Sequence, residues 1–234
     1  MDAGAKRISI IMPCYNERDT VLQAVEEVRR VPLPIRKEII VVDDGSTDGS
    51  REIISHNLPK EIKAILMPEN RGKGAAIREG LRAATGDFVI IQDTDLEQDP
   101  NDYNKLLAPL LDGTADVVYG TRMLNYRTNS QEQKMVFLAT LLLNLSCNIL
   151  YGSTITDVMT GYKAFRKSLL DSLDIRSRGF EFETEVTAKI LRKGCLIHEI
   201  PVRVVRWRSR EEGKKISWLD GPKILYYLIK FRIL

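Results

Sequence analysis

The sequence predicts an α/β protein whose sheet is mostly parallel and flanked by helices. Short, continuous apolar runs alternate with amphipathic helical patterns along the first half of the chain. These runs are rich in β-branched residues and end at turn-forming residues, which is typical of strands buried on both faces. Because strands that alternate with helices form crossover units, parallel pairing with helices on both sides is expected.

Four strands are expected in the first half, at residues 7–12, 38–42, 62–67 and 88–92. The first strand ends at Pro13, and the second runs into a turn-rich segment at 43–49. Helices are expected from Asp19 or Thr20 to about residue 30, after a cap at Ser46 or Thr47, and over 74–84.

The second half of the chain has less regular patterns. Strands are expected at 116–119, 162–165 and 197–205, and helices at 132–151, 182–192 and about 219–234. The last helix is amphipathic. Internal repeats and convincing linkers are absent from the sequence, so residues 1–234 are expected to form one domain.

Composition argues against several classes of protein. The three cysteines, Cys14, Cys147 and Cys195, are far apart and lack metal-type spacing, which favours a reducing compartment over a disulfide framework. His56 and His198 have no partners at ligand spacing, so a zinc site is not expected. The N-terminus lacks the apolar core of a signal peptide, and a cytoplasmic location is expected.

Positive charge gathers at the C-terminal end. Residues 203–234 carry nine Lys and Arg against three acids, a net +6, whereas the whole chain carries +3. An anionic partner is implied, either phosphate groups, an acidic membrane surface or nucleic acid. Nucleic acid is disfavoured because only Trp207 and Trp218 supply aromatic interleaving.

Acidic residues follow two of the predicted strands directly. Asp93-Thr94-Asp95 comes after the strand at 88–92, and Glu97 adds a third carboxylate. Ligands of parallel sheets sit beyond the carboxyl ends of the strands, and closely spaced carboxylates suit Mg²⁺ or Mn²⁺ together with substrate phosphates. The alternative interpretation is a solvated acidic turn.

Asp43-Asp44-Gly45-Ser46 occupies the equivalent place after the strand at 38–42. A carboxylate there can accept hydrogen bonds from a base edge or a ribose hydroxyl. A turn with a helix cap explains the same residues, and both roles can hold together. The Gly-rich segment 71–76 lacks the spacing of a P-loop, which excludes that class of ATPase.

The ordered motifs resemble glycosyltransferase family 2. They read IMPCYNE at 11–17, VVDDGSTDG at 41–49, NRGKGA at 70–75 and QDTDLE at 92–97. Further on, GTR at 120–122, TGYKAF at 160–165 and EIP at 199–201 look like the polyprenyl-phosphate branch of that family, typified by dolichol-phosphate mannose synthase.

The resemblance implies a GT-A type nucleotide-diphosphosugar transferase fold and an inverting transfer of mannose or glucose. The donor would be GDP-mannose or UDP-glucose, and the acceptor dolichyl or undecaprenyl phosphate. Around the nucleoside it places Pro13, Tyr15, Glu17, Val42 and Asp44. Asp93, Asp95 and Glu97 would hold a Mg²⁺ or Mn²⁺ ion that bridges the diphosphate, with Thr94 in the same donor turn. Glutamine is common at the place of Glu97, so this acid departs from the family pattern.

On the acceptor side, the resemblance places Arg122 against the phosphate. Family members carry an Arg followed by Gly-x-Ser-Lys near the C-terminus, where this chain has RSREEGKK at 208–215. Arg208, Arg210 and Lys214 are therefore candidates for a cationic cradle, with a solvated basic loop as the alternative.

The candidate catalytic residues are Asp95, Arg122 and Asp157. Asp157 lies near the acceptor in one interpretation and has a helix-end or loop role in the other. Three acids occupy the place where sugar-acceptor transferases often carry a base, with helix capping and surface roles as alternatives; they are Glu181, Glu183 and Glu185.

Two apolar segments bear on membrane binding. Residues 135–151 are too short to span a bilayer by the usual measure of ~20 residues, and Thr140, Asn144 and Asn148 form one polar stripe. Such a helix can lie in a membrane interface beside the active site or form a buried core helix. The C-terminal helix is either a surface anchor or a packing and subunit contact. A soluble or peripheral protein without a spanning helix is expected.

Two other functions stay open at this point. The same enzyme class can act on a soluble sugar or glycan. A non-catalytic nucleotide-sugar-binding or membrane-scaffold protein is the third interpretation, and the intact acidic pairs weigh against it.

Overall fold

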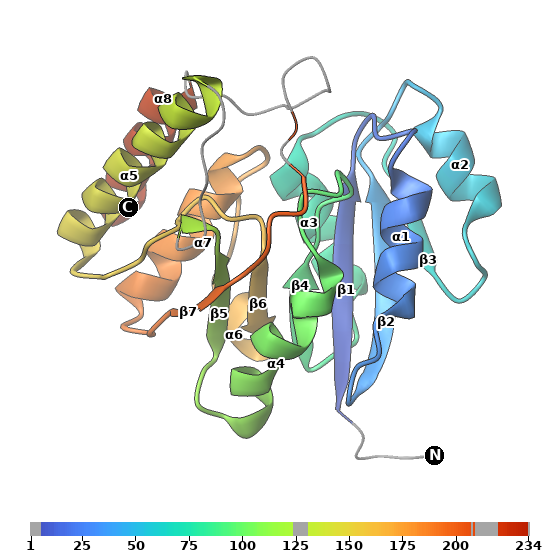
Figure 1. Ribbon diagram of the computed structural model, residues 1–234, viewed down its shortest axis with the longest axis horizontal. Coiled ribbons are helices and arrows are strands. Elements are labelled where there is room, and N and C mark those ends of the chain that lie inside the picture. The colour runs from blue at the N-terminus through green and yellow to red at the C-terminus, as the bar shows by residue number, and fades with distance from the viewer. Residues whose placement is uncertain (1–5, 124–130, 207, 209–219, 234) are drawn as a thin grey trace.

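The computed structural model describes residues 6–123, 131–206, 208 and 220–233, with the side chains of 131 and 132 left aside. Seven strands form one sheet in the order β3-β2-β1-β4-β6-β5-β7 (Figure 1). The strands are β1 (Arg7–Cys14), β2 (Arg36–Asp43), β3 (Lys63–Leu66), β4 (Phe88–Ile91), β5 (Val117–Thr121), β6 (Lys163–Arg166) and β7 (His198–Pro201). β6 runs antiparallel to β4 and β5, and all other pairs are parallel. The predicted mostly parallel sheet is confirmed.

Helices cover both faces of the sheet. On one face, apolar side chains of α1 (Val21–Arg30), α2 (Ser50–Asn57) and α4 (Tyr103–Asp112) share a core with β1, β2 and β4. On the other, α3 (Lys73–Ala83), α6 (Lys167–Asp171) and α7 (Glu181–Arg192) contribute to a second core. A short 3₁₀ turn, η1 (Pro100–Asp102), precedes α4. This three-layer arrangement follows from strands that are apolar on both faces.

Two further helices pack against each other beside the sheet. α5 (Gln131–Tyr151) and α8 (Gly221–Ile233) form a third apolar cluster from Leu143 and Cys147 of the first helix and Ile224 and Leu228 of the second (Figure 1). The Tyr151 hydroxyl also donates to the Leu228 carbonyl at 2.7 Å. The expected helix at 219–234 is therefore present from residue 221 to 233.

Several local predictions differ from the structure. α2 begins at Ser50, and the Asp48 carboxylate accepts from the Ser50 backbone N–H at 2.9 Å, so the predicted caps at Ser46 and Thr47 are wrong. Ser46 instead accepts from the Asn16 backbone N–H. β7 ends at Pro201 rather than 205, because the chain then leaves the β5 edge and crosses toward the residues that follow β4.

Candidate active site

The carboxyl ends of β1, β2, β4 and β5 border one cavity of about 380 Å³. The amino end of the antiparallel β6 reaches the same edge of the sheet, where Gly161 joins the lining. Eleven candidate site residues named from the sequence line this cavity: Pro13, Tyr15, Glu17, Asp44, Asp93, Thr94, Asp95, Glu97, Arg122, Glu183 and Arg208. The strand-end argument therefore places donor-side and acceptor-side candidates in one space.

Other predicted residues lie elsewhere. The Val42 side chain is fully buried in the core shared with α3 and does not line the cavity. Asp157 is also fully buried, and it lies behind Arg122 rather than facing the cavity as a catalytic group would. Arg210 and Lys214 lie outside the described residues.

Asp44 holds a loop of the cavity wall through hydrogen bonds. Its two carboxylate oxygens accept from the backbone N–H groups of Arg71 and Gly72, each at 2.8 Å. Burial raises the pKa of Asp44 and these donors lower it in part. Gly72 has φ of 95°, and a Cβ there would overlap the Arg178 carbonyl. Asp44 thus fixes the wall at 71–72 while its buried carboxylate stays at the cavity surface.

Three carboxylates follow β4. Asp93 receives the Lys73 ammonium at 2.8 Å, Asp95 Oδ1 accepts from the Glu97 backbone N–H at 3.1 Å, and Glu97 Oε1 accepts from the Arg208 backbone N–H at 3.0 Å. Burial, together with the negative charges of Asp93 and Glu97, raises the pKa of Asp95 to about 7. Within the described part of the chain, no three acidic, His or Cys side chains are gathered as a ready-made metal site.

The charge of the cavity fits a cation that arrives with the donor. Among the described lining residues, six are acids and three are cations, so the formal balance is −3. The acids are Glu17, Asp44, Asp93, Asp95, Glu97 and Glu183, and the cations are Lys73, Arg122 and Arg208. Mg²⁺ and Mn²⁺ bind through few carboxylates plus substrate phosphates. The residues after β4 therefore fit a divalent ion bound together with a diphosphate.

Lys73, at the start of α3, is a cavity cation that the sequence argument passed over. Its ammonium lies 2.8 Å from Asp93 Oδ1 and 3.2 Å from Glu183 Oε1. Burial on its own lowers the pKa of Lys73, but these two carboxylates outweigh it and raise the pKa, so the group stays cationic. The Gly-rich segment 71–76 lacks P-loop spacing, yet its lysine was the available signal for this cation.

The three glutamates of α7 have different surroundings. Glu183 reaches the cavity, where it is paired with Lys73 and with the buried Lys163. Glu181 accepts from the Gly179 backbone N–H at 3.0 Å, and Glu185 accepts from that of Ser177 at 2.7 Å. Capping of the preceding turn accounts for Glu181 and Glu185, while Glu183 belongs to a buried ion-pair network.

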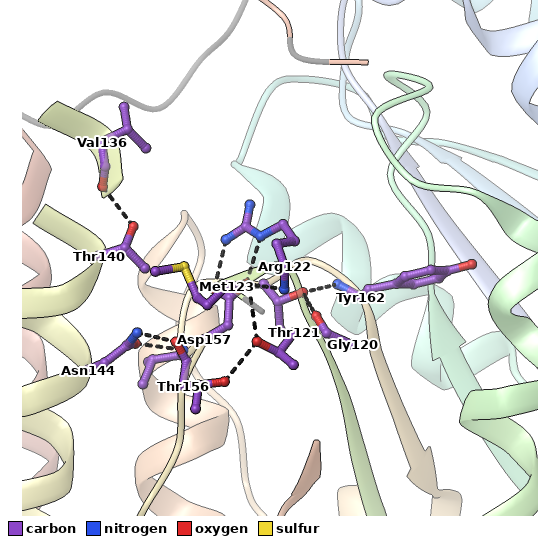
Figure 2. Close-up of polar contacts among 12 residues, drawn as sticks. Gly120, Thr121, Arg122, Met123, Val136, Thr140, Asn144, Thr156, Asp157 and Tyr162 are labelled. Carbon is purple, nitrogen blue, oxygen red and sulfur yellow. Dashed lines mark hydrogen bonds and ion pairs between the residues drawn. The ribbon is translucent and has the colours of Figure 1, made fainter. Parts of the chain in front are cut away.

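Arg122, directly after β5, presents a fixed guanidinium to the cavity. Nε donates to Asp157 Oδ2 at 2.7 Å and Nη2 donates to Oδ1 at 2.8 Å (Figure 2). The arginine backbone N–H also donates to Oδ2, at 3.1 Å. A bidentate pair of this kind fixes the plane of the guanidinium as well as its position.

Arg208 connects the C-terminal part of the chain to the first motif. Its Nη1 lies 2.8 Å from both oxygens of Glu17, and both side chains are nearly buried. The Val205 backbone N–H donates to the Glu97 carbonyl at 2.9 Å. Residues 204–206 and Arg208 therefore lie across the residues that follow β1 and β4.

α5 presents one face to the cavity and another to the exterior. Val136, Ala139, Thr140 and Leu143 line the cavity. On the outside, large apolar side chains are exposed at positions that include Leu138, Leu142, Leu145 and Ile149, the last at 73%. By length and composition alone, residues 133–151 could cross a membrane, and 22% of the stretch is buried. The core helix of a soluble protein can meet the same two criteria.

Comparison with known proteins gives a consistent result. Residues 9–174 match the family described as glycosyl transferase family 2. The chain is 30% identical over 97% of its length to the undecaprenyl-phosphate 4-deoxy-4-formamido-L-arabinose transferase of Salmonella choleraesuis, of which it spans 68%. It is 27% identical over 96% of its length to the low-salt glycan biosynthesis hexosyltransferase Agl6 of Haloferax volcanii, of which it spans 54%.

Among solved structures, glucosyl-3-phosphoglycerate synthase from Mycobacterium tuberculosis, in complex with Mn²⁺, UDP-glucose and phosphoglyceric acid, matches with a TM-score of 0.72 and 23% identity. The match covers 99% of this chain and 81% of that one. This likeness confirms the GT-A type fold predicted from the sequence.

Proposed function

The chain belongs to glycosyl transferase family 2, and we propose that it moves a hexose, with inversion, from a nucleoside-diphosphate sugar to a polyprenyl phosphate. One observation carries the proposal. The carboxylates after β4 and the oriented guanidinium of Arg122 line the same cavity, and one wall of that cavity is a helix with an exposed apolar side. A diphosphate, a phosphate acceptor and a lipid tail each meet matching chemistry there.

On the donor side, Asp93, Asp95 and Glu97 would hold Mg²⁺ or Mn²⁺, which neutralises charge that develops on the departing diphosphate. Lys73, kept cationic by Asp93 and Glu183, adds positive charge at the same edge. Glu17, Tyr15 and Asp44 border the part of the cavity next to β1 and β2, where the nucleoside would lie. The donor base and sugar stay open between GDP-mannose and UDP-glucose.

On the acceptor side, Arg122 would bind the phosphate. An acceptor phosphate oxygen attacks the anomeric carbon from the side opposite the diphosphate. The bond between that carbon and the leaving oxygen breaks, and its electron pair departs on the nucleoside diphosphate. A phosphate is already anionic near neutral pH, because its second pKa is about 6, so the attack needs little help from a base. Arg208 is a further candidate for this cationic cradle.

The acceptor assignment draws support from one relative and from the surface of α5. The Salmonella relative is named for transfer to undecaprenyl phosphate. α5 and α8 expose apolar side chains beside the basic residues Lys223, Lys230 and Arg232, which suits an anionic membrane surface. α5 also lines the cavity and bonds to a neighbouring loop through polar side chains, so it would lie at the interface rather than cross it.

A soluble phosphorylated acceptor is the second candidate. The structurally similar synthase was solved with phosphoglyceric acid, and Arg122 suits any phosphate ester. The chain spans about half of one curated relative and 61% of another, so activities of those whole proteins are carried over here only as proposals.

The test is a transfer assay with radiolabelled GDP-mannose or UDP-glucose, a divalent ion and undecaprenyl phosphate in detergent or vesicles. We expect label in the lipid fraction of the wild-type reaction. Asp95→Asn should lose this label, while its circular dichroism spectrum shows that the fold is unchanged. Label only in a soluble phosphorylated product would favour the second candidate. Binding of donor without turnover on any acceptor would favour a non-catalytic protein.

A further inference from the structure

The segment 156–158 is held from two sides by elements far apart in the sequence. From β7, Glu199 accepts the Thr156 backbone N–H at 2.8 Å and the Asp157 backbone N–H at 3.0 Å, one on each carboxylate oxygen. From α5, Asn144 accepts the Val158 backbone N–H at 3.0 Å and donates to the Thr156 carbonyl (Figure 2). Four backbone groups on three consecutive residues are thus fixed by two side chains.

Asp157 is the middle residue of this segment. Its carboxylate is fully buried and receives the Nε, Nη2 and backbone N–H groups of Arg122. Thr121, the residue before Arg122, is joined to Thr156 by a hydroxyl–hydroxyl bond of 2.8 Å. The place of the guanidinium in the cavity is therefore set by where the segment 156–158 is held.

Neither the Glu199 side chain nor the Asn144 side chain lines the cavity. Asn144 is 5% exposed, and each of its amide atoms is already engaged with the segment. These side chains therefore do not touch a ligand in the cavity, and the hydrogen bonds of the segment connect them to it through Asp157 and Arg122. The effects of substitutions within such a network are not additive.

We propose that Glu199 and Asn144 are positioning residues for the acceptor anion, acting through Asp157 on the guanidinium of Arg122. The inference rests on the proposed function, because that function assigns Arg122 to the acceptor phosphate. The inference predicts a selective effect. Substitution of Glu199 or Asn144 should weaken acceptor binding and leave donor binding unchanged.

The first test is steady-state kinetics of Glu199→Gln with varied acceptor and varied donor. Glutamine keeps the size but can accept at only one terminal atom, so one backbone N–H of the segment loses its acceptor. We expect the acceptor KM to rise about tenfold, within the range for one coupled network, and the donor KM to stay within about twofold. Asn144→Ala should shift the same constant in the same direction.

Glu38→Gln is the matched control. Glu38 also accepts two consecutive backbone N–H groups, those of Thr85 and Gly86, but both bonds end on Oε1 and lie at the opposite edge of the sheet, so glutamine can keep them while the negative charge is lost. An effect of removing a partly buried carboxylate charge as such would appear in both variants. Equal changes in donor and acceptor KM in Glu199→Gln, or an acceptor effect of the same size in Glu38→Gln, would overturn the proposal.

A double-mutant cycle sharpens the result. In an Arg122→Ala background, Glu199→Gln should have no further effect on the acceptor KM, because the group it positions is gone. Additive losses would show a separate structural role and overturn the inference.

An activity-independent measurement separates this inference from the proposed function. The Arg122 Nε–H resonance, assigned by its loss in Arg122→Ala, should be a protected, resolved NMR signal. It should broaden or shift in Glu199→Gln and in Asp157→Asn, and stay unchanged in Glu38→Gln. An unchanged signal in Glu199→Gln would overturn the inference whether or not the protein transfers sugar. Absence of transfer by the wild-type protein, with the signal behaving as expected, would overturn only the function.

Discussion

Gly161 lies where the chain approaching β6 passes the acids that follow β4. A Cβ at this position would overlap the Asp93 Oδ2 atom, with the Lys73 ammonium and the Gln98 amide close behind. The atom that has to move is the end of a side chain rather than backbone. A substitution there should therefore disturb the site more than the fold.

We expect Gly161→Ala to lower kcat/KM at least about tenfold, because Asp93 would be displaced from its place beside the donor, while the melting temperature changes by only a few degrees. Initial rates and a thermal melt of the same preparation check this. Gly113→Ala is the control, since its Cβ would meet nothing within 4 Å, although its positive φ costs some stability. Wild-type activity in Gly161→Ala would contradict the role given to Asp93.

Glu185, on α7, is a buried carboxylate whose titration should change the free energy of unfolding. Burial on its own raises the pKa of Glu185, but hydrogen bonds from Lys189 and Ser177 outweigh it and leave the pKa lowered. A carboxyl group with a lowered folded-state pKa adds stability at pH values above its unfolded pKa, about 4.3, and that stability is lost as the pH falls through the folded pKa.

We therefore expect Glu185→Gln to lower the melting temperature most at pH 6–7, with the difference from wild type shrinking below about pH 4. Thermal melts across that range give the comparison. Glu79→Gln, which removes an exposed pair with Arg82, should change little at any pH, because exposed pairs contribute about 0–1 kcal/mol. A gap between Glu185→Gln and wild type that persists at pH 3 would disprove the linkage.

At the scale of elements, the outer face of α5 invites a direct test. Leu142 and Leu145 are each 57% exposed. Burying one leucine side chain contributes about 1.5–3 kcal/mol, so Leu142→Asp with Leu145→Asp should reduce partition onto vesicles containing phosphatidylglycerol by at least about tenfold. Co-sedimentation measures this. Leu22→Asp, at a 40% exposed leucine of α1, is the control and should bind as wild type does.

Unchanged vesicle binding by the doubly substituted protein would exclude α5 as the contact. A dimer in gel filtration that is lost in the same variant would instead assign this face to a subunit contact.

Most strands and helices could be predicted because their signals are local. The strands at the N-terminal half are continuous apolar runs, and the acids after β2 and β4 stand next to them in sequence. α4 was missed although Tyr103, Leu106, Leu107 and Leu110 follow the helical period and are all buried. Pro109 lies inside that helix and counts against it on propensity alone, yet packing against β5 and β6 outweighs it.

At the scale of the whole molecule, the net negative charge of the cavity leads us to expect that donor binding depends on a divalent ion. We expect UDP or GDP with Mn²⁺ to raise the melting temperature by more than the separate effects of nucleotide and ion. At about 100 times Kd, a ligand adds about 2.7 kcal/mol of stability, which corresponds to roughly 5–10 °C for a chain of this size. Differential scanning fluorimetry with EDTA as the comparison measures it.

In Asp95→Asn the joint effect of nucleotide and Mn²⁺ should be lost, while Glu26→Gln on the exposed side of α1 should keep it. Equal stabilisation by the nucleotide in EDTA would show that the donor binds without a metal and would remove the reason for placing an ion at Asp93, Asp95 and Glu97.

The donor side could be predicted further than the acceptor side for a physical reason. Asp93, Asp95 and Asp44 follow strands that pair in parallel, so their place at one edge of the sheet is implied by the chain itself. The insertion of β6 between β4 and β5 is a non-local pairing that no local pattern indicates. Phe180 and the cavity face of α5 are likewise brought to the site by packing between elements far apart in the sequence. Whether residues 1–234 form one folding unit stays a prediction.

α5 is a wall one helix thick, about 10 Å across, between the cavity and the exposed apolar surface. A molecule with an anionic head and a long hydrocarbon tail is amphiphilic: its head is stable in water and its tail in an apolar phase. With its head at Arg122 and its tail over the outside of α5, it would react without leaving the oil phase, while the sugar donor would never leave water. The protein would then work as a phase-transfer catalyst whose boundary is a single helix.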